Sequence, residues 1–260
     1  MSAPYISFRD VCFTYNERAA EVLSNLNLEL KRGEFFLLLG PSGCGKTTVL
    51  NLLAGFEQPT VGQIAVGGTP VTGPGPDRIV IFQGDDSLLG WLSTMENVEF
   101  GLMLAGMGRR ERRARADRAL KMVGLAGQDG KHPHELSGGM KQRVQIARAL
   151  VCDADILLMD EPFAAVDAQT RAILQDELAR IWMETQRTVL FITHDIAEAI
   201  ILGDRIGVMR AGPRSGVKEI IANDLPRPRS RGDVAFANMY ARIERAVSEE
   251  VQLTVQRETR

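Results

Sequence analysis

Residues Gly40-Pro-Ser-Gly-Cys-Gly-Lys-Thr47 are the stretch that decides the fold. They follow the continuously apolar run Phe35–Leu39 and lead into a helical stretch from Lys46 to about Ala54. The pattern Gly-x-x-x-x-Gly-Lys-Thr between a strand and a helix predicts a loop that wraps phosphate groups. Its glycines let backbone N–H groups turn inward, and the helix N-terminus adds positive potential. The alternative, a glycine-rich turn that binds nothing, would need the whole pattern and both flanking elements to coincide by chance.

Each polar side chain of this loop has an expected contact. Lys46 is expected at the β and γ phosphates of a nucleotide, the Thr47 hydroxyl on Mg²⁺, and Thr48 nearby with a further hydroxyl. The predicted cofactor-binding residues here are Gly40, Pro41, Ser42, Gly43, Cys44, Gly45, Lys46, Thr47 and Thr48.

Two kinds of strand are expected around the loop. Period-two alternation in the first third predicts half-buried strands of an antiparallel layer at Ile6–Phe8, Val11–Tyr15, Leu26–Leu30 and Ile64–Val66, the last entering a Gly67-Gly68 turn. Short continuous apolar runs predict strands buried on both faces of a mostly parallel sheet: Phe35–Leu39, Ile79–Phe82, Ile156–Met159, Val189–Ile192 and Ile206–Met209. Helical spacing from Ile173 to Trp182 places a helix between two of them, which gives an α/β architecture.

The segment 86–151 has a different pattern. It contains no convincing strand, and apolar residues from Met140 to Val151 mark one helix stripe, so an inserted helical subdomain is expected. After Leu225, a Pro-Arg-Pro-Arg loop precedes a last amphipathic helix. The expected domains are a nucleotide-binding domain over 1–225, with its core in 1–85 and 152–225, and a C-terminal loop and helix over 226–260.

Four polar residues follow the apolar strands directly or after one residue. Ligands of a parallel sheet lie beyond the carboxyl ends of its strands, so Gln83, Asp160, Glu161 and His194 are expected beside the phosphate loop. Taken singly, each could be an ordinary surface group at a strand end. Asp160 is expected to hold the Mg²⁺ shell, Glu161 to act as general base on the attacking water, Gln83 to sense metal or water, and His194 to hydrogen-bond the γ-phosphate. Catalysis is thus assigned to Glu161, His194 and Gln83, and metal binding to Thr47, Gln83 and Asp160.

Bulk composition excludes several classes of protein. The formal net charge of −2 gives no basic field for nucleic acid, so no nucleic-acid partner is expected, and the basic runs Arg109–Arg118 and Arg227–Arg231 are interpreted as a solvated helix face and a solvated loop. Three cysteines at unrelated spacings fit a reducing cytosol. The N-terminal residues lack a signal-peptide pattern, and no apolar run approaches the ~20 residues of a membrane span.

A second glycine-rich motif decides the class. It is Leu136-Ser-Gly-Gly-Met-Lys-Gln-Arg143, which lies at the start of the helix expected from Met140. Ser137 is expected to be the N-cap of this helix, and Gly138-Gly139 would let the backbone come close to an anion. An ordinary Ser-Gly-Gly helix start is the alternative for this motif alone. The motif resembles the signature of ABC ATPases, in which it closes over ATP bound to the other subunit. The resemblance covers about Tyr5 to Leu225.

The resemblance implies a fold, cofactors and partners. The fold is that of a P-loop NTPase, with a RecA-like, mostly parallel core, an N-terminal antiparallel β layer and an inserted helical subdomain. The cofactors are ATP and Mg²⁺, with Tyr15 stacked on adenine and Asp167 in the loop Ala164-Ala-Val-Asp167. The partners are a second nucleotide-binding subunit, identical or paired, transmembrane permease subunits and, indirectly, an extracytoplasmic solute-binding protein. The location implied is peripheral, at the cytoplasmic face of the inner membrane.

Finer features resemble the nitrate/sulfonate/taurine importer group. They are the segment from Gln83 to Leu92, the run Asp160–Arg171 and the tail Asp224–Arg229. Gly90 replaces a common Pro, and Ala164 and Val166 depart from the common Ser-Ala-Leu-Asp loop. The segment Asp85–Trp91, with Leu88, Leu89 and Trp91 exposed, is expected to receive a permease helix, although core packing is an equal alternative for the two leucines. An exporter or lipid-transport subunit and a soluble non-transport ABC ATPase are the other functions considered.

Overall fold

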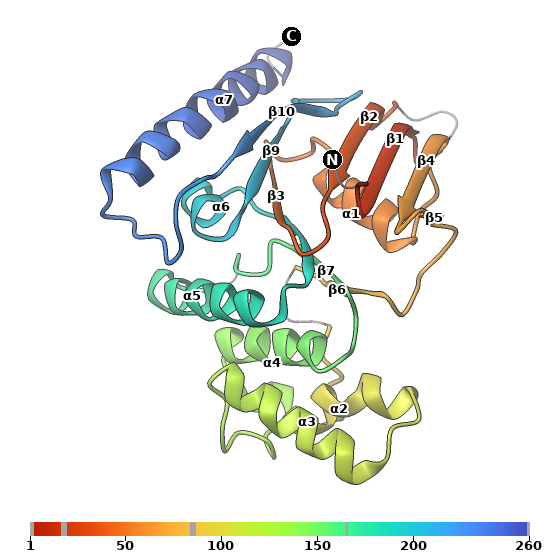
Figure 1. Cartoon of the computed structure of the whole chain (residues 1–260), viewed down its shortest axis with the longest axis vertical. Helices are drawn as coiled ribbons and strands as arrows, with labels where there is room; N and C mark the ends of the chain where they lie inside the picture. Colours follow the sequence, from red (N-terminus) through yellow and green to blue (C-terminus); the bar gives the residue numbers. More distant parts are fainter. Residues whose placement is uncertain (1–2, 17–19, 84–86, 165, 259–260) are drawn as a thin grey trace. The chain divides into compact units, whose positions relative to one another are not determined.

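The computed structural model describes residues 3–16, 20–83, 87–164 and 166–258 of the chain. It has two compact units: unit 1 comprises Met1–Arg78 and Gln186–Arg260, and unit 2 comprises Ile79–Thr185 (Figure 1). The expected limits of the helical subdomain, at 85/86 and 151/152, differ from these unit boundaries and stay a prediction. Ala165 of the loop Ala164–Asp167, and Asp85 and Asp86 of the expected docking segment, lie outside the described residues.

Unit 1 begins with an antiparallel sheet, drawn in red and orange in Figure 1. Its strands have the order β2-β1-β4-β5 and are β1 (Ile6–Phe13), β2 (Leu23–Leu30), β4 (Val61–Val66) and β5 (Thr69–Pro70). Alternate residues such as Phe8, Leu28 and Ile64 are buried, which confirms the expected antiparallel layer. The two-residue turn between β4 and β5 needs positive φ at both positions, and Gly67 (56°) and Gly68 (82°) supply it.

The second sheet of unit 1 holds the phosphate loop. Its order is β10-β9-β3-β8, with β3 (Phe35–Leu39) parallel to both β8 (Thr188–Ile192) and β9 (Arg205–Met209), and β10 (Val217–Ala222) antiparallel to β9. Every residue of β3 and β8 is buried, which is why their sequences are continuously apolar. The helices of this unit are α1 (Lys46–Ala54), α6 (Ile196–Leu202) and α7 (Val234–Glu258).

Unit 2 contains β6 (Arg78–Ile81), which starts at the unit boundary, and β7 (Ile156–Asp160), the strand before α5 (Ala168–Thr185). Between them lie α2 (Thr94–Leu104), α3 (Arg109–Met122), the 3₁₀ turn η1 (Pro133–Glu135) and α4 (Gly138–Leu150). Helices α2, α3 and α4 pack against one another (Figure 1). The described part of 86–151 therefore has helices and no strand, as expected. Within the described ranges, no helix is long and apolar enough to cross a membrane.

The Pro-Arg-Pro-Arg tail corrects one expectation, because Arg227 and Arg229 are not in a solvated loop. The Arg229 guanidinium donates to five carbonyl oxygens, those of Ile200, Ile201, Gly203, Asn223 and Leu225. Arg227 donates to the carbonyls of Ile201 and Leu202 and pairs with Asp204 at 2.8 Å. Burial, followed by the charge of Arg227, lowers the pKa of Arg229 to about 10. The two side chains satisfy carbonyls at the C-terminal end of α6, where a helix leaves them unpaired. The other basic run, Arg109–Arg118, is mostly exposed on α3.

Candidate functional site

The phosphate loop joins the buried end of β3 to the first turn of α1. Gly43 (φ 74°) and Gly45 (φ 93°) have left-handed backbone conformations. Gly45 occupies the N-cap position of α1, where no side-chain hydrogen bond caps the helix. A Cβ at Gly40 would lie 2.9 Å from Cys44 Sγ and 3.0 Å from Met209 Cβ, so this position has room for glycine alone. No side chain caps the first turn of α1, so its N–H groups remain available to an anion.

Lys46 lies within this loop and is only 7% exposed. Its Nζ donates to the carbonyl oxygens of Gly40 and Pro41, both at 2.9 Å, and lies 4.0 Å from Cys44 Sγ. Across the described ranges no carboxylate pairs with it. Because a buried charge is costly unless it is paired, this ammonium is suited to an anionic ligand. Burial also raises the pKa of the Cys44 thiol, so the thiol beside the ammonium stays protonated near neutral pH.

Tyr15 lies just beyond β1 and is held against α1. Its hydroxyl is 3.1 Å from Thr48 Oγ1, and its ring meets Phe13 edge-on with centroids 4.8 Å apart. The side chain is 54% exposed. An aromatic ring anchored at both its hydroxyl and its edge, with an open face, suits stacking on a planar base.

His194 leaves the same edge of the sheet as the phosphate loop. Leu38 of β3 and Ile192 of β8 are register partners, and the Thr193 N–H donates to the Leu38 carbonyl. Gly40 and His194 each follow two residues after that pair, on parallel strands about 4.8 Å apart. His194 is exposed, whereas Thr193 is 2% exposed. The expected position of His194 at the carboxyl end of a strand beside the loop is therefore observed.

Unit 2 brings Gln83 and Glu161 together. Gln83 Nε2 donates to Glu161 Oε2 at 3.4 Å. Asp160 ends β7 with 8% of its surface exposed, and the next residue, Glu161, is half-buried. Glu161 has a φ of 43°, a left-handed conformation that costs a residue with a Cβ about 1–2 kcal/mol. The strained backbone turns this carboxylate away from the strand direction immediately after the buried Asp160.

The residues of the second glycine motif line an open cavity of about 500 Å³. Ser137 is the N-cap of α4 and accepts a hydrogen bond from the Met140 N–H, which confirms its predicted cap. Ser137 and Gly138 are exposed, and a Cβ at Gly139 would lie 3.2 Å from Thr170 Cγ2. Asp167, which lies across the cavity, accepts from the backbone N–H groups of Gln169 and Thr170. Hydrogen bonds from Thr170 lower the pKa of Asp167, so its carboxylate stays ionised.

These donors fit ATP and Mg²⁺. The left-handed glycines and the buried Lys46 suit phosphate, and Tyr15 suits a base. The hydroxyl of Thr47, the amide of Gln83 and the carboxylate of Asp160 are hard oxygen donors of the kind that Mg²⁺ prefers. The roles assigned to the individual residues stay predictions.

The expected docking segment is only partly exposed. Trp91 is 75% exposed as expected, but Leu88 is 8% exposed and Leu89 is half-buried, so the expectation of an exposed Leu88 is wrong. Sequence reasoning missed the residue that fixes this segment. The buried Asn97 amide donates to the carbonyls of Leu89 and Leu92 and accepts from the Leu89 N–H. The signal was the capping box Ser93-x-x-Glu96, which places the start of α2 next to it.

Comparisons with known proteins agree with this geometry. The family model described as ABC transporter matches residues 23–164. A nitrate import ATP-binding protein of Synechococcus elongatus is 45% identical over 85% of this chain and 81% of its own. A bicarbonate transport ATP-binding protein of a Synechocystis strain is 48% identical over 81% and 75%. A dimeric ATP-binding cassette bound to ADP and Pi, in a post-hydrolysis state, is 32% identical with a TM-score of 0.73, over 86% of this chain and 99% of that one.

The chain belongs to the ABC transporter family. It is an ATP-binding subunit with ATPase activity in transport, and its fold is that of the P-loop ATPase cassettes. ATP and Mg²⁺ are its cofactors, and the similar cassette bound to ADP and Pi is a dimer.

Proposed function

We propose that the chain energises import of a small oxyanion, acting as one of two ATPase subunits on the cytoplasmic face of the inner membrane. One observation carries the proposal: the chain has two separate anion cradles, a closed loop around Lys46 and an open cavity at Ser137. A monomer needs only one cradle for one ATP. Two subunits arranged head to tail would use Lys46 of one and Ser137 of the other for the same nucleotide.

In this proposal the chain's own residues carry out hydrolysis in defined roles. Glu161 accepts the proton of the attacking water, and the amide of Gln83 orients its carboxylate. Lys46 neutralises the charge that develops on the phosphates, while His194 donates to the γ-phosphate. Thr47, Gln83 and Asp160 would hold Mg²⁺, which would supply neutralisation of phosphate charge. Tyr15 holds the base.

The substrate class rests on the relatives. Two relatives of nearly equal identity are named for nitrate and for bicarbonate, both small planar oxyanions. Sulfonates such as taurine belong to the same proposal through the segment Gln83–Leu92 and the tail. A separate permease and a solute-binding protein on the opposite face of the membrane would select the cargo. An ATPase subunit of this kind supplies energy from ATP and does not contain the cargo site.

The first experiment tests the chemistry with Glu161→Gln. Steady-state turnover should fall by a factor of about 10² or more while ATP affinity is kept, because only the general base is lost. The variant should also accumulate as an ATP-bound dimer in gel filtration. Glu244→Gln, on an exposed position of α7, is the control and should behave as wild type. Near-normal turnover of Glu161→Gln would rule out the assignment of the base.

The second experiment tests the cargo. The subunit is reconstituted with its permease and candidate binding protein, and ATPase activity is followed during titration with nitrate, bicarbonate, taurine and alkanesulfonates. Activity should rise with one of them, because a loaded binding protein biases the permease toward the state that closes the ATP dimer. If none of these anions stimulates activity while basal ATPase activity is intact, the proposal of an anionic cargo is refuted. The ATPase assignment would still stand.

The third experiment tests docking at Trp91, the most exposed aromatic side chain in the described part of unit 2. Trp91→Ala should uncouple transport in vesicles and spare ATPase of the isolated subunit. Val234→Ala, at a 77% exposed position on α7, is the control. Unchanged transport by a folded Trp91→Ala subunit would contradict docking at this residue.

A further inference from the structure

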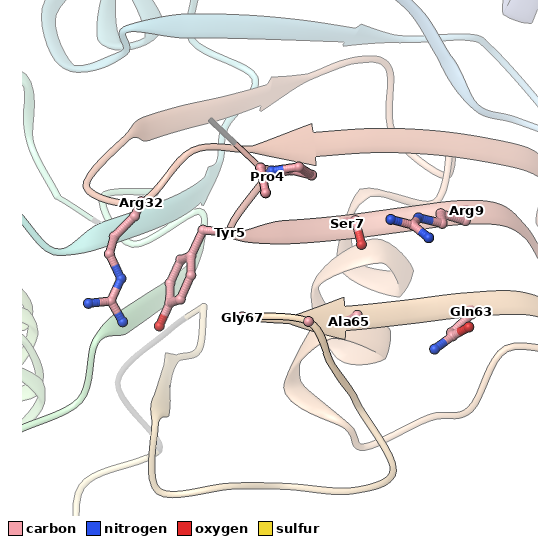
Figure 2. A pocket seen from close by; sticks show the side chains of 10 residues that line it. Pro4, Tyr5, Ser7, Arg9, Arg32, Gln63, Ala65 and Gly67 are labelled. Atoms are coloured by element: carbon pink, nitrogen blue, oxygen red, sulfur yellow. The ribbon is translucent and has the colours of Figure 1, made fainter. Parts of the chain in front are cut away.

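A second pocket, lined by no residue of the phosphate loop, lies on the antiparallel sheet of unit 1. Its volume is about 470 Å³, and its lining comes from residues 3–9, Arg32 and residues 63–68. Figure 2 shows the labelled side chains along β1 and β4. The volume is in the range of small-molecule sites and far above the roughly 30 Å³ of one water molecule.

The register of the sheet explains why polar groups gather there. Ser7 pairs with Ala65, and Arg9 pairs with Gln63, across β1 and β4. Alternate residues of a strand share a face, so these four lie on the face opposite the buried Ile6, Phe8 and Ile64. The core packing of one face therefore fixes the positions of the polar residues on the other.

One end of the pocket is built by Tyr5 and Arg32. The Arg32 guanidinium lies over the Tyr5 ring at 4.4 Å from its centroid. The Tyr5 ring also lies beside Gly67, where a Cβ would be 3.7 Å from Tyr5 Cε2. In Figure 2, Arg9 and Gln63 lie at the other end of the pocket, and Ser7 lies between the two ends. A guanidinium thus stands at each end.

Three polar groups of the pocket lack partners in the described part of the chain. Ser7 is 6% exposed and its hydroxyl makes no hydrogen bond there. The Arg9 guanidinium and the Gln63 amide have no side-chain partner there either. None of the described residues that line the pocket is acidic. The neighbouring Glu29, opposite Ser7 on β2, is exposed and makes no ion pair with Arg9.

We propose that this pocket binds a small organic anion through a phosphate or carboxylate group. Arg9 at one end of the pocket donates to the oxygens of this group, Arg32 at the other end donates to a second acceptor of the ligand, and the Ser7 hydroxyl donates between them. The organic body packs on Pro4 and Ala65. Guanidinium groups suit this class of ligand because they donate in pairs to planar or tetrahedral oxyanions. The site takes an anion without Mg²⁺ and is independent of the ATPase chemistry.

The test is isothermal titration of the full chain carrying Lys46→Ala, which weakens phosphate binding at the nucleotide loop. The probes are AMP, succinate and inorganic phosphate. AMP or succinate should bind with a Kd of about 1 mM or lower. Adding Arg9→Gln or Arg32→Gln should weaken binding about tenfold or more, because each removes a charge-assisted donor. Ser7→Ala should weaken it severalfold, and Arg242→Gln on α7 should change nothing.

Circular dichroism and the melting temperature of each variant show that the chain is folded. The proposal is overturned if neither organic probe binds at this level, if inorganic phosphate alone binds, or if binding persists in folded Arg9→Gln and Arg32→Gln proteins. None of these outcomes depends on ATP turnover, so failure here is distinguishable from failure of the ATPase assignment.

Discussion

The two glycine-rich helix starts of this chain, at Gly40–Lys46 and at Ser137–Gly139, are built in opposite ways. In the first, Lys46 is buried and its ammonium is held by the carbonyls of the loop. In the second, Ser137 and Gly138 are exposed at an open cavity of about 500 Å³. The first cradle holds a buried cation, whereas the second is open and combines an exposed hydroxyl and backbone N–H groups with Arg143 in the cavity lining.

Because of this difference, the two cradles are expected to bind anions with different strength on their own. A loop with a buried cation can bind a polyphosphate within one chain. An open, hydrated cradle contributes weakly until another surface closes over it and excludes water. We therefore expect the closed cradle to bind the nucleotide and the open cradle to complete the nucleotide site of a second subunit.

The largest effect is expected for Lys46→Ala. Loss of the ammonium removes a preorganised charge from the phosphates, so turnover should fall by a factor of about 10³. ATPase assays and nucleotide titration of the purified chain measure it. Lys31→Ala, at an exposed position outside the loop, is the matched control and should keep full activity. Substantial ATPase activity in Lys46→Ala would show that the closed cradle is not the nucleotide site.

The next effect is complementation between two inactive subunits. Lys46→Ala and Ser137→Arg proteins are mixed, and each heterodimer then has one intact composite site and one doubly damaged site. Activity should rise well above that of either variant alone and depend on protein concentration. If activity instead scales linearly with monomer at all concentrations, the open cradle is not completed by a second subunit.

A smaller effect is expected in thiol labelling. Burial raises the pKa of Cys44, so its thiolate fraction at any pH below that pKa is smaller than for an ordinary thiol, and labelling increases only as pH rises toward it. Ser137→Cys introduces a thiol at the open cradle and should react with iodoacetamide about 10² times faster at pH 8. Peptide mapping by mass spectrometry measures both sites in one protein. Equal rates would contradict the closed nature of the first cradle.

The smallest effect concerns the helix cap. Ser137→Ala removes the acceptor of the Met140 N–H and should lower the free energy of unfolding by about 1 kcal/mol in urea titration. Ser137→Asp keeps a cap and is the control for stability. The loop around Lys46 offers no counterpart, because Gly45 caps α1 without a side chain. An unchanged stability in Ser137→Ala would show that the cap hydrogen bond contributes nothing.

Much of the fold was predictable where one strong local pattern decides it. The five continuously apolar runs all fall on strands, and α1 spans Lys46–Ala54 as expected. The expected burial on both faces is wrong for the run Ile79–Phe82, because only Ile81 of β6 is buried and Phe82, beyond the strand, is 44% exposed. The strand β10 was not predicted, since Val217–Ala222 mixes charged and apolar residues at the sheet edge.

The misses depend on partners that are distant in sequence. Arg229 finds its acceptors in residues such as Ile200 and Asn223, and the pattern Pro-Arg-Pro-Arg gives no hint of them. Leu88 is buried in a segment too short for any periodicity, and its neighbour Leu89 is fixed by Asn97. The roles of Gln83, Asp160, Glu161 and His194 stay predictions, although the hydrogen bond between Gln83 and Glu161 is the contact expected of a sensor and a base.

The left-handed backbone of Glu161 implies a conflict between selection for stability and selection for activity. Glycine accepts this conformation without strain and asparagine accepts it at low cost, so Glu161→Gly and Glu161→Asn should both make the chain harder to unfold. Neither can take a proton from water. A population selected only for heat resistance should therefore drift away from glutamate at this position, and one selected for growth on the cargo should retain it.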